Sequence, residues 1–134
     1  MKYGSVILAL QRATHATLHL VHGDLTPSEV NALGNLADGR ARTVSELGAD
    51  IGSKPATLTG ILDRLERRGL IERGAHAGDR RAVVITLTAE GVRAADAIHQ
   101  RLAEVERAAL AHLDPHALDG FHAVVDALTT GSHR

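Results

Sequence analysis

The chain has 134 residues, of which 44% are hydrophobic and 23% charged, with a formal net charge of −1. These values are typical of one folded domain with its own core. The chain has no cysteine, which excludes disulfides, thiolate catalysis and cysteine-based peroxide sensing. No apolar run approaches the ~20 residues of a membrane span, and no convincing signal peptide is present, so we expect a cytoplasmic protein without a membrane partner.

Apolar periodicity and capping signals predict a mainly α (α+β) fold. The first helix is expected from Ser5 to about Val21. Thr26 and Thr43 begin the next two helices, because each is followed three residues later by a glutamate, the pattern of a capping box. A fourth helix begins near Pro55 and ends before Gly69. Its apolar residues recur at helical spacing: Leu58, Ile61, Leu62 and Leu65.

A β-hairpin follows the fourth helix. Its strands are predicted at Leu70–Arg73 and Ala82–Leu87, with Gly74–Arg81 as the loop between them. Thr88 then caps a long helix to about His112, and a last helix begins at Asp114-Pro115.

The first helix and the last two each have an apolar face that the hairpin module does not need. These faces must pack against one another or against a partner, and a two-fold homodimer is the commonest solution. A monomer with an elongated helical cap is the alternative.

The charges are unevenly distributed. Nine basic and six acidic residues lie between Arg40 and Arg81, a net charge of +3, so the rest of the chain has −4. A basic middle between acidic flanks is the asymmetry expected of a DNA-contacting module.

The fourth helix has small and polar residues opposite its apolar stripe. Side chains near the N-terminal end of such a helix can reach base edges in a major groove. Lys54, Thr57 and Thr59 are candidates for phosphate or base contacts, and Ala56 and Gly60 would let the backbone approach DNA. Arg64 lies on the same face. The alternative is a solvated surface helix.

The hairpin tip contains Asp79-Arg80-Arg81, preceded by His76 and Gly78. Arginine at the end of a narrow ribbon can enter a minor groove, where the negative potential is focused. Asp79 does not suit a phosphate contact, and we interpret it as a brace for the arginines or the loop. The alternative is a solvated turn.

Taken together, these residues resemble the MarR family of transcription regulators. The most specific segments are ILDRLERRGLIER, Asp79-Arg80-Arg81 and Leu87-Thr88 at the entry to the long helix. The resemblance covers nearly the whole chain, 1–134, as a single MarR-like domain. It implies a winged helix-turn-helix at 26–87 and dimerisation helices at 1–22 and 88–134.

The resemblance also implies how such a protein works. A homodimer would straddle a pseudo-palindromic operator in double-stranded DNA, with major-groove contacts from Ser53 to Arg64 and wing contacts from His76, Arg80 and Arg81. Many members are repressors that are released by small, often anionic or phenolic, ligands bound between the two regions. The first helix is short for the family, which affects the predicted effector pocket more than the DNA site.

Histidines on the first helix offer further chemistry. His15, His19 and His22 lie on one stripe and are our candidates for an effector site. Imidazole also suits zinc, so a zinc-responsive regulator is an alternative, as are solvated histidines. No nucleophile-and-base motif or phosphate-binding glycine loop is present, so we expect no enzyme and no obligatory cofactor. A winged-helix protein-interaction module that does not bind DNA is a further alternative.

Overall fold

The computed structural model of the chain describes residues 4–21, 23–76 and 79–131, apart from the side chains of His76 and residues 79–82. These residues form two compact units that divide after Ala103, within a helix. The elements in chain order are α1 (Val6–Leu18), α2 (Pro27–Leu36), β1 (Arg42–Thr43), α3 (Val44–Ile51), α4 (Pro55–Arg67), β2 (Ile71–His76), β3 (Asp79–Leu87), α5 (Ala89–Leu110) and α6 (Pro115–Gly131).

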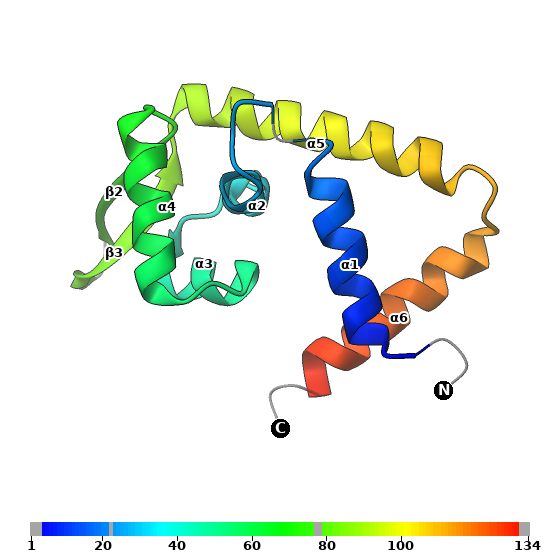
Figure 1. The fold of residues 1–134 in the computed structure, drawn as a ribbon. Coiled ribbons are helices and arrows are strands. Elements are labelled where there is room, and N and C mark those ends of the chain that lie inside the picture. Colours follow the sequence, from blue (N-terminus) through cyan, green and yellow to red (C-terminus); the bar gives the residue numbers. More distant parts are fainter. Residues whose placement is uncertain (1–3, 22, 77–78, 132–134) are drawn as a thin grey trace. The chain divides into compact units, whose positions relative to one another are not determined.

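The first unit is mainly helical with one small antiparallel sheet, as the sequence predicts. The strand order is β1-β3-β2 (Figure 1). In the β2–β3 hairpin, Ile71 pairs with Leu87 and Ala75 pairs with Val83. The short strand β1 pairs Arg42 with Ile85 on the other side of β3. A helix-turn-helix, α3 and α4, therefore precedes a two-stranded wing, which is the winged-helix arrangement.

Capping boxes begin two of the helices. The Thr26 hydroxyl accepts a hydrogen bond from the Glu29 amide at 3.1 Å, and the Glu29 carboxylate accepts one from the Thr26 amide at 3.0 Å. Thr43 and Glu46 make the same reciprocal pair at 3.1 and 3.2 Å. Both caps confirm the sequence prediction. Each pair satisfies two amides that a helix start leaves without an intrahelical partner.

The core of the first unit is built from aliphatic side chains of α2, α3, α4, the sheet and α5. Its largest members are buried almost completely: Val30, Leu33, Leu36, Leu47, Leu58, Ile61, Leu62, Leu65, Ile71 and Ile85. The four α4 residues predicted as the core stripe are all in this set. Burying them leaves the opposite face of α4 at the surface.

The flanking helices bury much less. Neither α1 nor α6 has a buried residue. α1 exposes Val6, Ile7 and Leu8, and within the second unit α6 exposes a row of apolar side chains. That row consists of Leu118, Phe121, Val124 and Leu128. None of the helices in the described part of the chain is long and apolar enough to span a membrane.

The structure corrects three predicted boundaries. The predicted loop Gly74–Arg81 was wrong, because β2 continues to His76 and β3 already begins at Asp79. A bulge between Ala75 and His76 interrupts the register near the tip. The first helix ends at Leu18 rather than near Val21. Strand β1 was not predicted at all.

Candidate nucleic-acid interface

Helix α4 holds half of the ten residues predicted to contact DNA. Ala56, Thr57, Thr59 and Arg64 are exposed, and Gly60 is half-buried. The Thr59 hydroxyl donates a hydrogen bond to the Pro55 carbonyl at 2.9 Å, within its own helix. The hydroxyl of Thr57 and the guanidinium of Arg64 are therefore better placed than Thr59 to meet an external partner.

The start of α4 differs from the starts of α2 and α3. Lys54 occupies the N-cap position and makes no side-chain capping hydrogen bond. Pro55 supplies the first helical residue, which has no amide hydrogen to satisfy. The amides of the following residues lie at the positive end of the helix dipole, beside an exposed lysine. This end of α4 is chemically suited to a phosphate oxygen.

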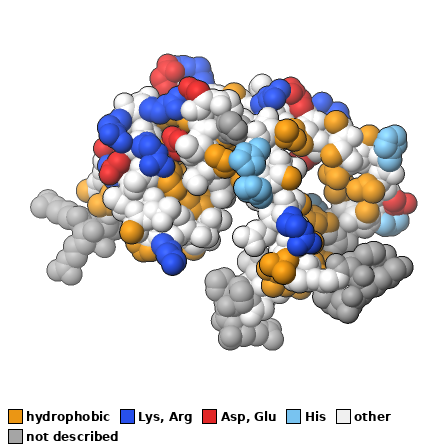
Figure 2. All heavy atoms as spheres, in the orientation of Figure 1, with side chains coloured by type: hydrophobic (Ala, Val, Ile, Leu, Met, Phe, Trp, Pro, Cys, Tyr) orange, Lys and Arg blue, Asp and Glu red, His pale blue; other side chains and the backbone are white. Residues whose placement is uncertain are grey.

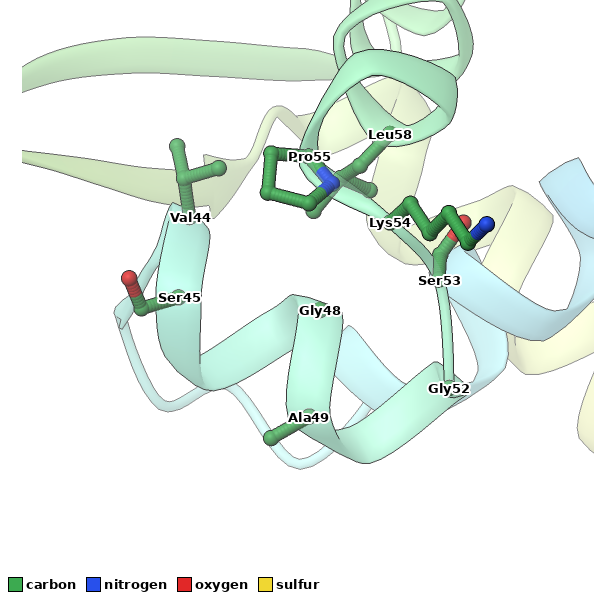
Figure 3. Close-up of a pocket in the computed structure, with 9 residues that line it drawn as sticks. All are labelled: Val44, Ser45, Gly48, Ala49, Gly52, Ser53, Lys54, Pro55 and Leu58. Atoms are coloured by element: carbon green, nitrogen blue, oxygen red, sulfur yellow. The ribbon is translucent and has the colours of Figure 1, made fainter.

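The turn between α3 and α4 forms a hollow of about 460 Å³ at the surface (Figure 3). Val44 and Ser45 lie at one end of the hollow, and Ser53 and Lys54 lie at the other. Gly52 makes the turn with a positive φ of 66°. The hollow therefore has Ser53 and Lys54 next to the start of α4. Half-buried Ser53, predicted as a DNA contact, thus lies in the turn itself.

Of the six arginines in the basic middle whose side chains are described, four are held by carboxylates of the same unit. Arg73 donates to Asp63 at 2.8 Å and to Glu66 at 3.1 Å, and the Glu66 carboxylate raises the pKa of the Arg73 guanidinium. Arg68 pairs with Asp24 at 2.7 Å, and this contact lowers the pKa of Asp24. These arginines connect elements of the fold and are not available to phosphates.

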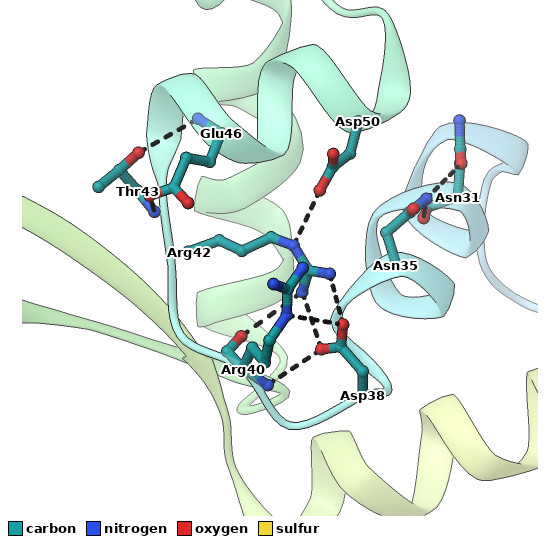
Figure 4. A network of polar contacts seen from close by, with 8 residues as sticks. All are labelled: Asn31, Asn35, Asp38, Arg40, Arg42, Thr43, Glu46 and Asp50. Carbon is teal, nitrogen blue, oxygen red and sulfur yellow. Dashed lines mark hydrogen bonds and ion pairs between the residues drawn. The ribbon is translucent and has the colours of Figure 1, made fainter. Parts of the chain in front are cut away.

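Arg42 is the most buried of these arginines, with 7% of its side chain exposed. It reaches the Asp38 carboxylate at 2.6 Å and Asp50 at 2.8 Å (Figure 4). Arg40 also contacts Asp38, at 3.2 Å. The guanidinium of Arg42 holds the pKa of Asp38 well below its usual range. This network fastens the end of α2 to β1 and α3.

The basic groups that remain for DNA are few. Among the residues whose side chains are described, no ion pair engages Lys54, Arg64 or Arg67. Arg67 donates to the Asp63 carbonyl at 3.3 Å. Figure 2 shows basic side chains gathered over the part of the molecule that contains α4. Of the nine basic residues between Arg40 and Arg81, Lys54, Arg64 and Arg67 are thus those with described side chains that form no ion pair.

The wing tip lies mostly outside the described residues. The backbone places Asp79, Arg80 and Arg81 in strand β3, with His76 paired to Asp79. Their side chains are outside the described residues. The wing contacts of His76, Arg80 and Arg81 and the brace role of Asp79 therefore stay predictions.

The start of α5 is fastened to the end of α4. The Thr88 hydroxyl donates to the Gly69 carbonyl at 2.6 Å and accepts from the Gly91 amide at 3.0 Å. The Thr88 amide donates to the Leu70 carbonyl at 3.1 Å. A methyl group on Gly91 would overlap this same Leu70 carbonyl. The sequence indicated Thr88 as a cap but gave no signal for Gly91.

The described histidines that were predicted to bind an effector do not line the groove beside α2 and α5. His15 and His19 are exposed on α1, and His22 lies outside the described residues. A groove of about 540 Å³ runs beside α2 and α5, and His99 lines it. The other residues lining this α2–α5 groove are Gly34, Asn35, Ala37, Asp38, Arg42 and Asp96. The sequence prediction missed His99, which contacts the Gly34 carbonyl at 2.9 Å.

Comparison with known proteins agrees with this geometry. Residues 25–83 match the model of the MarR family. The winged helix-turn-helix of this chain is thus similar to that of the MarR family. A stretch of 67 residues, 50% of the chain, is 36% identical to the HTH-type transcriptional repressor MdtR of Bacillus subtilis and covers 43% of it. The curated relatives that match are thus covered over less than half of their length.

Solved structures of transcription regulators share the fold over nearly the whole chain. A probable transcriptional regulator from Pseudomonas aeruginosa is 26% identical with a TM-score of 0.74, and the match covers 96% of this chain and 99% of that one. NadR in complex with 4-hydroxyphenylacetate is 25% identical with a TM-score of 0.83, covering 96% and 94% of the two chains. The chain is therefore similar in fold to transcription regulators over nearly its whole length.

Proposed function

We propose that this MarR-family regulator is a homodimeric, sequence-specific DNA-binding repressor whose DNA affinity is modulated by a small organic effector. The observation that supports it best is the start of α4, where an uncapped helix end, Lys54 and exposed Thr57 lie together. In the same unit, α2 and α3 cap their own starts. The open end of α4 would be completed by a DNA phosphate.

The mode of binding follows from the exposed face of α4. The phosphate contact at Lys54 would orient the helix, and Ala56, Thr57 and Gly60 would face base edges in the major groove. Small residues allow the backbone to approach the bases, and the Thr57 hydroxyl can donate or accept. Arg64, one turn beyond Gly60, would reach a phosphate on the groove wall.

The flanking helices support the homodimer. α1 and α6 each expose an apolar face within their own unit. A second copy would remove these side chains from water, and a two-fold arrangement would present two α4 helices to a pseudo-palindromic site. Analytical ultracentrifugation at micromolar concentration tests this part. A sedimentation coefficient of a dimer is expected, and a monomer at all concentrations would contradict it.

The α2–α5 groove is the proposed effector site. It joins the basic groups of Arg42 and His99 with carboxylates of Asp38 and Asp96 and the Asn35 amide. A small hydroxyaryl carboxylate suits this groove, since its anionic end would meet His99 and its hydroxyl would donate to Asp96. The similarity to NadR bound to 4-hydroxyphenylacetate supports this class. His99 then replaces His15, His19 and His22 as the proposed effector contact.

The DNA-binding claim is tested by selection and salt titration. The purified protein is used to enrich duplexes from a random pool, and anisotropy then measures affinity for the selected and random duplexes between low and physiological salt. We expect nanomolar binding to a palindromic site and a steep loss with salt. No salt-sensitive association with any duplex would favour the alternative, a winged-helix protein-interaction module.

Two further measurements test the wing contacts and the effector groove separately. Changing Arg80 and Arg81 together to alanine is expected to weaken operator binding without changing the dimer, and unchanged affinity would refute the wing contacts. Adding 4-hydroxyphenylacetate to the protein–DNA complex is expected to release DNA in the wild type but much less in His99→Ala. Release that is equal in both proteins would contradict the groove assignment.

A further inference from the structure

The side-chain rings of two histidines of α1 are in contact. His15 and His19 are one helical turn apart, and their Nε2 atoms are 3.3 Å from each other. The rings meet edge to face, with centroids 4.6 Å apart and planes at 88°. Both side chains are exposed, so a solute can reach the point between the two nitrogens. Neither ring lines the grooves beside α2 and α5.

The separation of the two nitrogens is that of neighbouring ligands on one metal ion. Zinc–imidazole bonds are about 2.0–2.1 Å, so two ligands at the tetrahedral angle are about 3.3 Å apart. The two Nε2 atoms of His15 and His19 are 3.3 Å apart. Histidines four residues apart on a helix lie on one face and can share one zinc ion. The helix thus already holds both nitrogens near chelating distance.

We propose that His15 and His19 form a two-imidazole site for a late first-row divalent cation, with Zn²⁺, Ni²⁺ and Cu²⁺ as its class. Imidazole nitrogen is a preferred ligand of these ions. No set of three metal-ligating side chains is formed by the described residues, so water or a small exogenous ligand completes the coordination. Both rings bind as neutral imidazoles with the proton on Nδ1, which leaves each Nε2 lone pair for the metal.

The site has a structural consequence for α1. This helix has 13 residues and no buried side chain in the first unit. Helices shorter than ~12–15 residues are marginal unless tertiary contacts support them. A cation that bridges residues 15 and 19 links successive turns and therefore stabilises the helical form. This site stands apart from the proposed DNA contacts, so its test is independent of operator binding.

The test uses tag-free full-length protein and Zn²⁺ in competition with a chromophoric chelator. The chain has nine histidines, so the assignment depends on variants. His15→Gln and His19→Gln are each expected to lower Zn²⁺ affinity by about tenfold or more, because each removes one of two protein ligands. His116→Gln is the control, since it removes an exposed histidine of α6, and it is expected to bind Zn²⁺ like the wild type.

Thermal melting gives a second readout. A ligand that binds only the folded state raises the melting midpoint, so Zn²⁺ is expected to raise the midpoint of the wild type and of His116→Gln. The rise is expected to be lost in His15→Gln and in His19→Gln. Wild-type Zn²⁺ affinity in either of these two variants would overturn the proposal, and so would an equal loss of affinity in the control.

Discussion

The helix-turn-helix with its wing differs from the flanking helices α1 and α6 in how far its apolar side chains are buried and its charges are paired. The module buries the apolar stripe of α4 completely, and carboxylates of the same unit pair with four of its six arginines whose side chains are described. α1 and α6 bury no residue. The first region is complete within one chain, whereas the second has apolar surface that remains to be covered.

Among the starts of α2, α3 and α4, one lacks a side-chain capping hydrogen bond. Capping boxes close α2 and α3, and Lys54 leaves α4 without a side-chain cap. We propose that the incomplete hydrogen bonding at α4 is where DNA binds. The incomplete apolar burial in the flanks is, in the same proposal, covered by a second copy of the chain. The predictions below separate these two kinds of surface.

The largest effect is expected from a cavity in the module. Leu65 is 0% exposed, and Leu65→Ala should lower the free energy of unfolding by about 2–5 kcal/mol. Leu128→Ala, in a side chain of α6 that is 36% exposed, should cost much less at low protein concentration. It should instead raise the dimer dissociation constant. Chemical denaturation at several protein concentrations measures both, and an equal loss in the two variants would contradict the contrast.

A glycine pair gives the next largest difference. Gly91→Ala places a methyl group against the Leu70 carbonyl, and such overpacking should cost about 1–3 kcal/mol. The matched control is Gly120→Ala in α6, where, apart from the adjoining backbone of the helix itself, no atom of the described residues lies within 4 Å of the added carbon. That change should be neutral or stabilising by up to about 1 kcal/mol, because alanine is the better helix former. Thermal denaturation is the measurement, and a stable Gly91→Ala would show that the junction of α4 and α5 is not tightly packed.

Thr88→Val should have a smaller effect on the same junction. It keeps the shape of the side chain but removes the hydrogen bonds to Gly69 and Gly91, at a cost of about 0.5–2 kcal/mol. Thr129→Val, the control, removes a bond to the Val125 carbonyl within α6. Urea denaturation should show a larger loss for the first variant, and the reverse order would refute the proposed role of Thr88.

The smallest expected effect is on the stability of the fold at low pH. Arg42 holds the pKa of Asp38 below its ordinary value, so the folded state gains stability from the ionised carboxylate above the unfolded-state pKa of about 3.9. This gain is lost as the pH falls below that value toward the folded-state pKa. Asp38→Asn should therefore flatten the decline of stability between about pH 4 and 2. Asp119→Asn in α6 is the control, and a decline that Asp38→Asn leaves unchanged would contradict the account.

Local signals predicted the fold well where one segment determines its own structure. The capping boxes at Thr26 and Thr43 and the apolar stripe of α4 appear as expected. The wing differed because pairing across the hairpin extends both strands into a segment whose glycines and charges favour a loop. Strand β1 has two residues, too few for any periodicity, and exists only through its pairing with β3.

Long-range contacts account for what the sequence could not show about the site. The pairing of Arg68 with Asp24 joins residues 44 positions apart, and the sequence offers no sign of it. Such pairs reduce the basic surface that charge counting predicts. The periodicity of α4 predicted which of its residues are exposed. Only the structure shows that Lys54 makes no side-chain capping hydrogen bond. His99 was missed because its groove is formed by two helices distant in sequence.

The most direct test of the central claim is the salt dependence of binding to a duplex selected by the protein, compared between wild type and Lys54→Gln. Each phosphate contact contributes about 0.9 to the slope of log affinity against log salt, so losing one contact per protomer of a dimer should reduce the slope by about 2. Arg107→Gln, which removes an equal charge near the end of α5, should leave it unchanged. An unaltered slope in Lys54→Gln would contradict the claim that the open start of α4 binds a DNA phosphate.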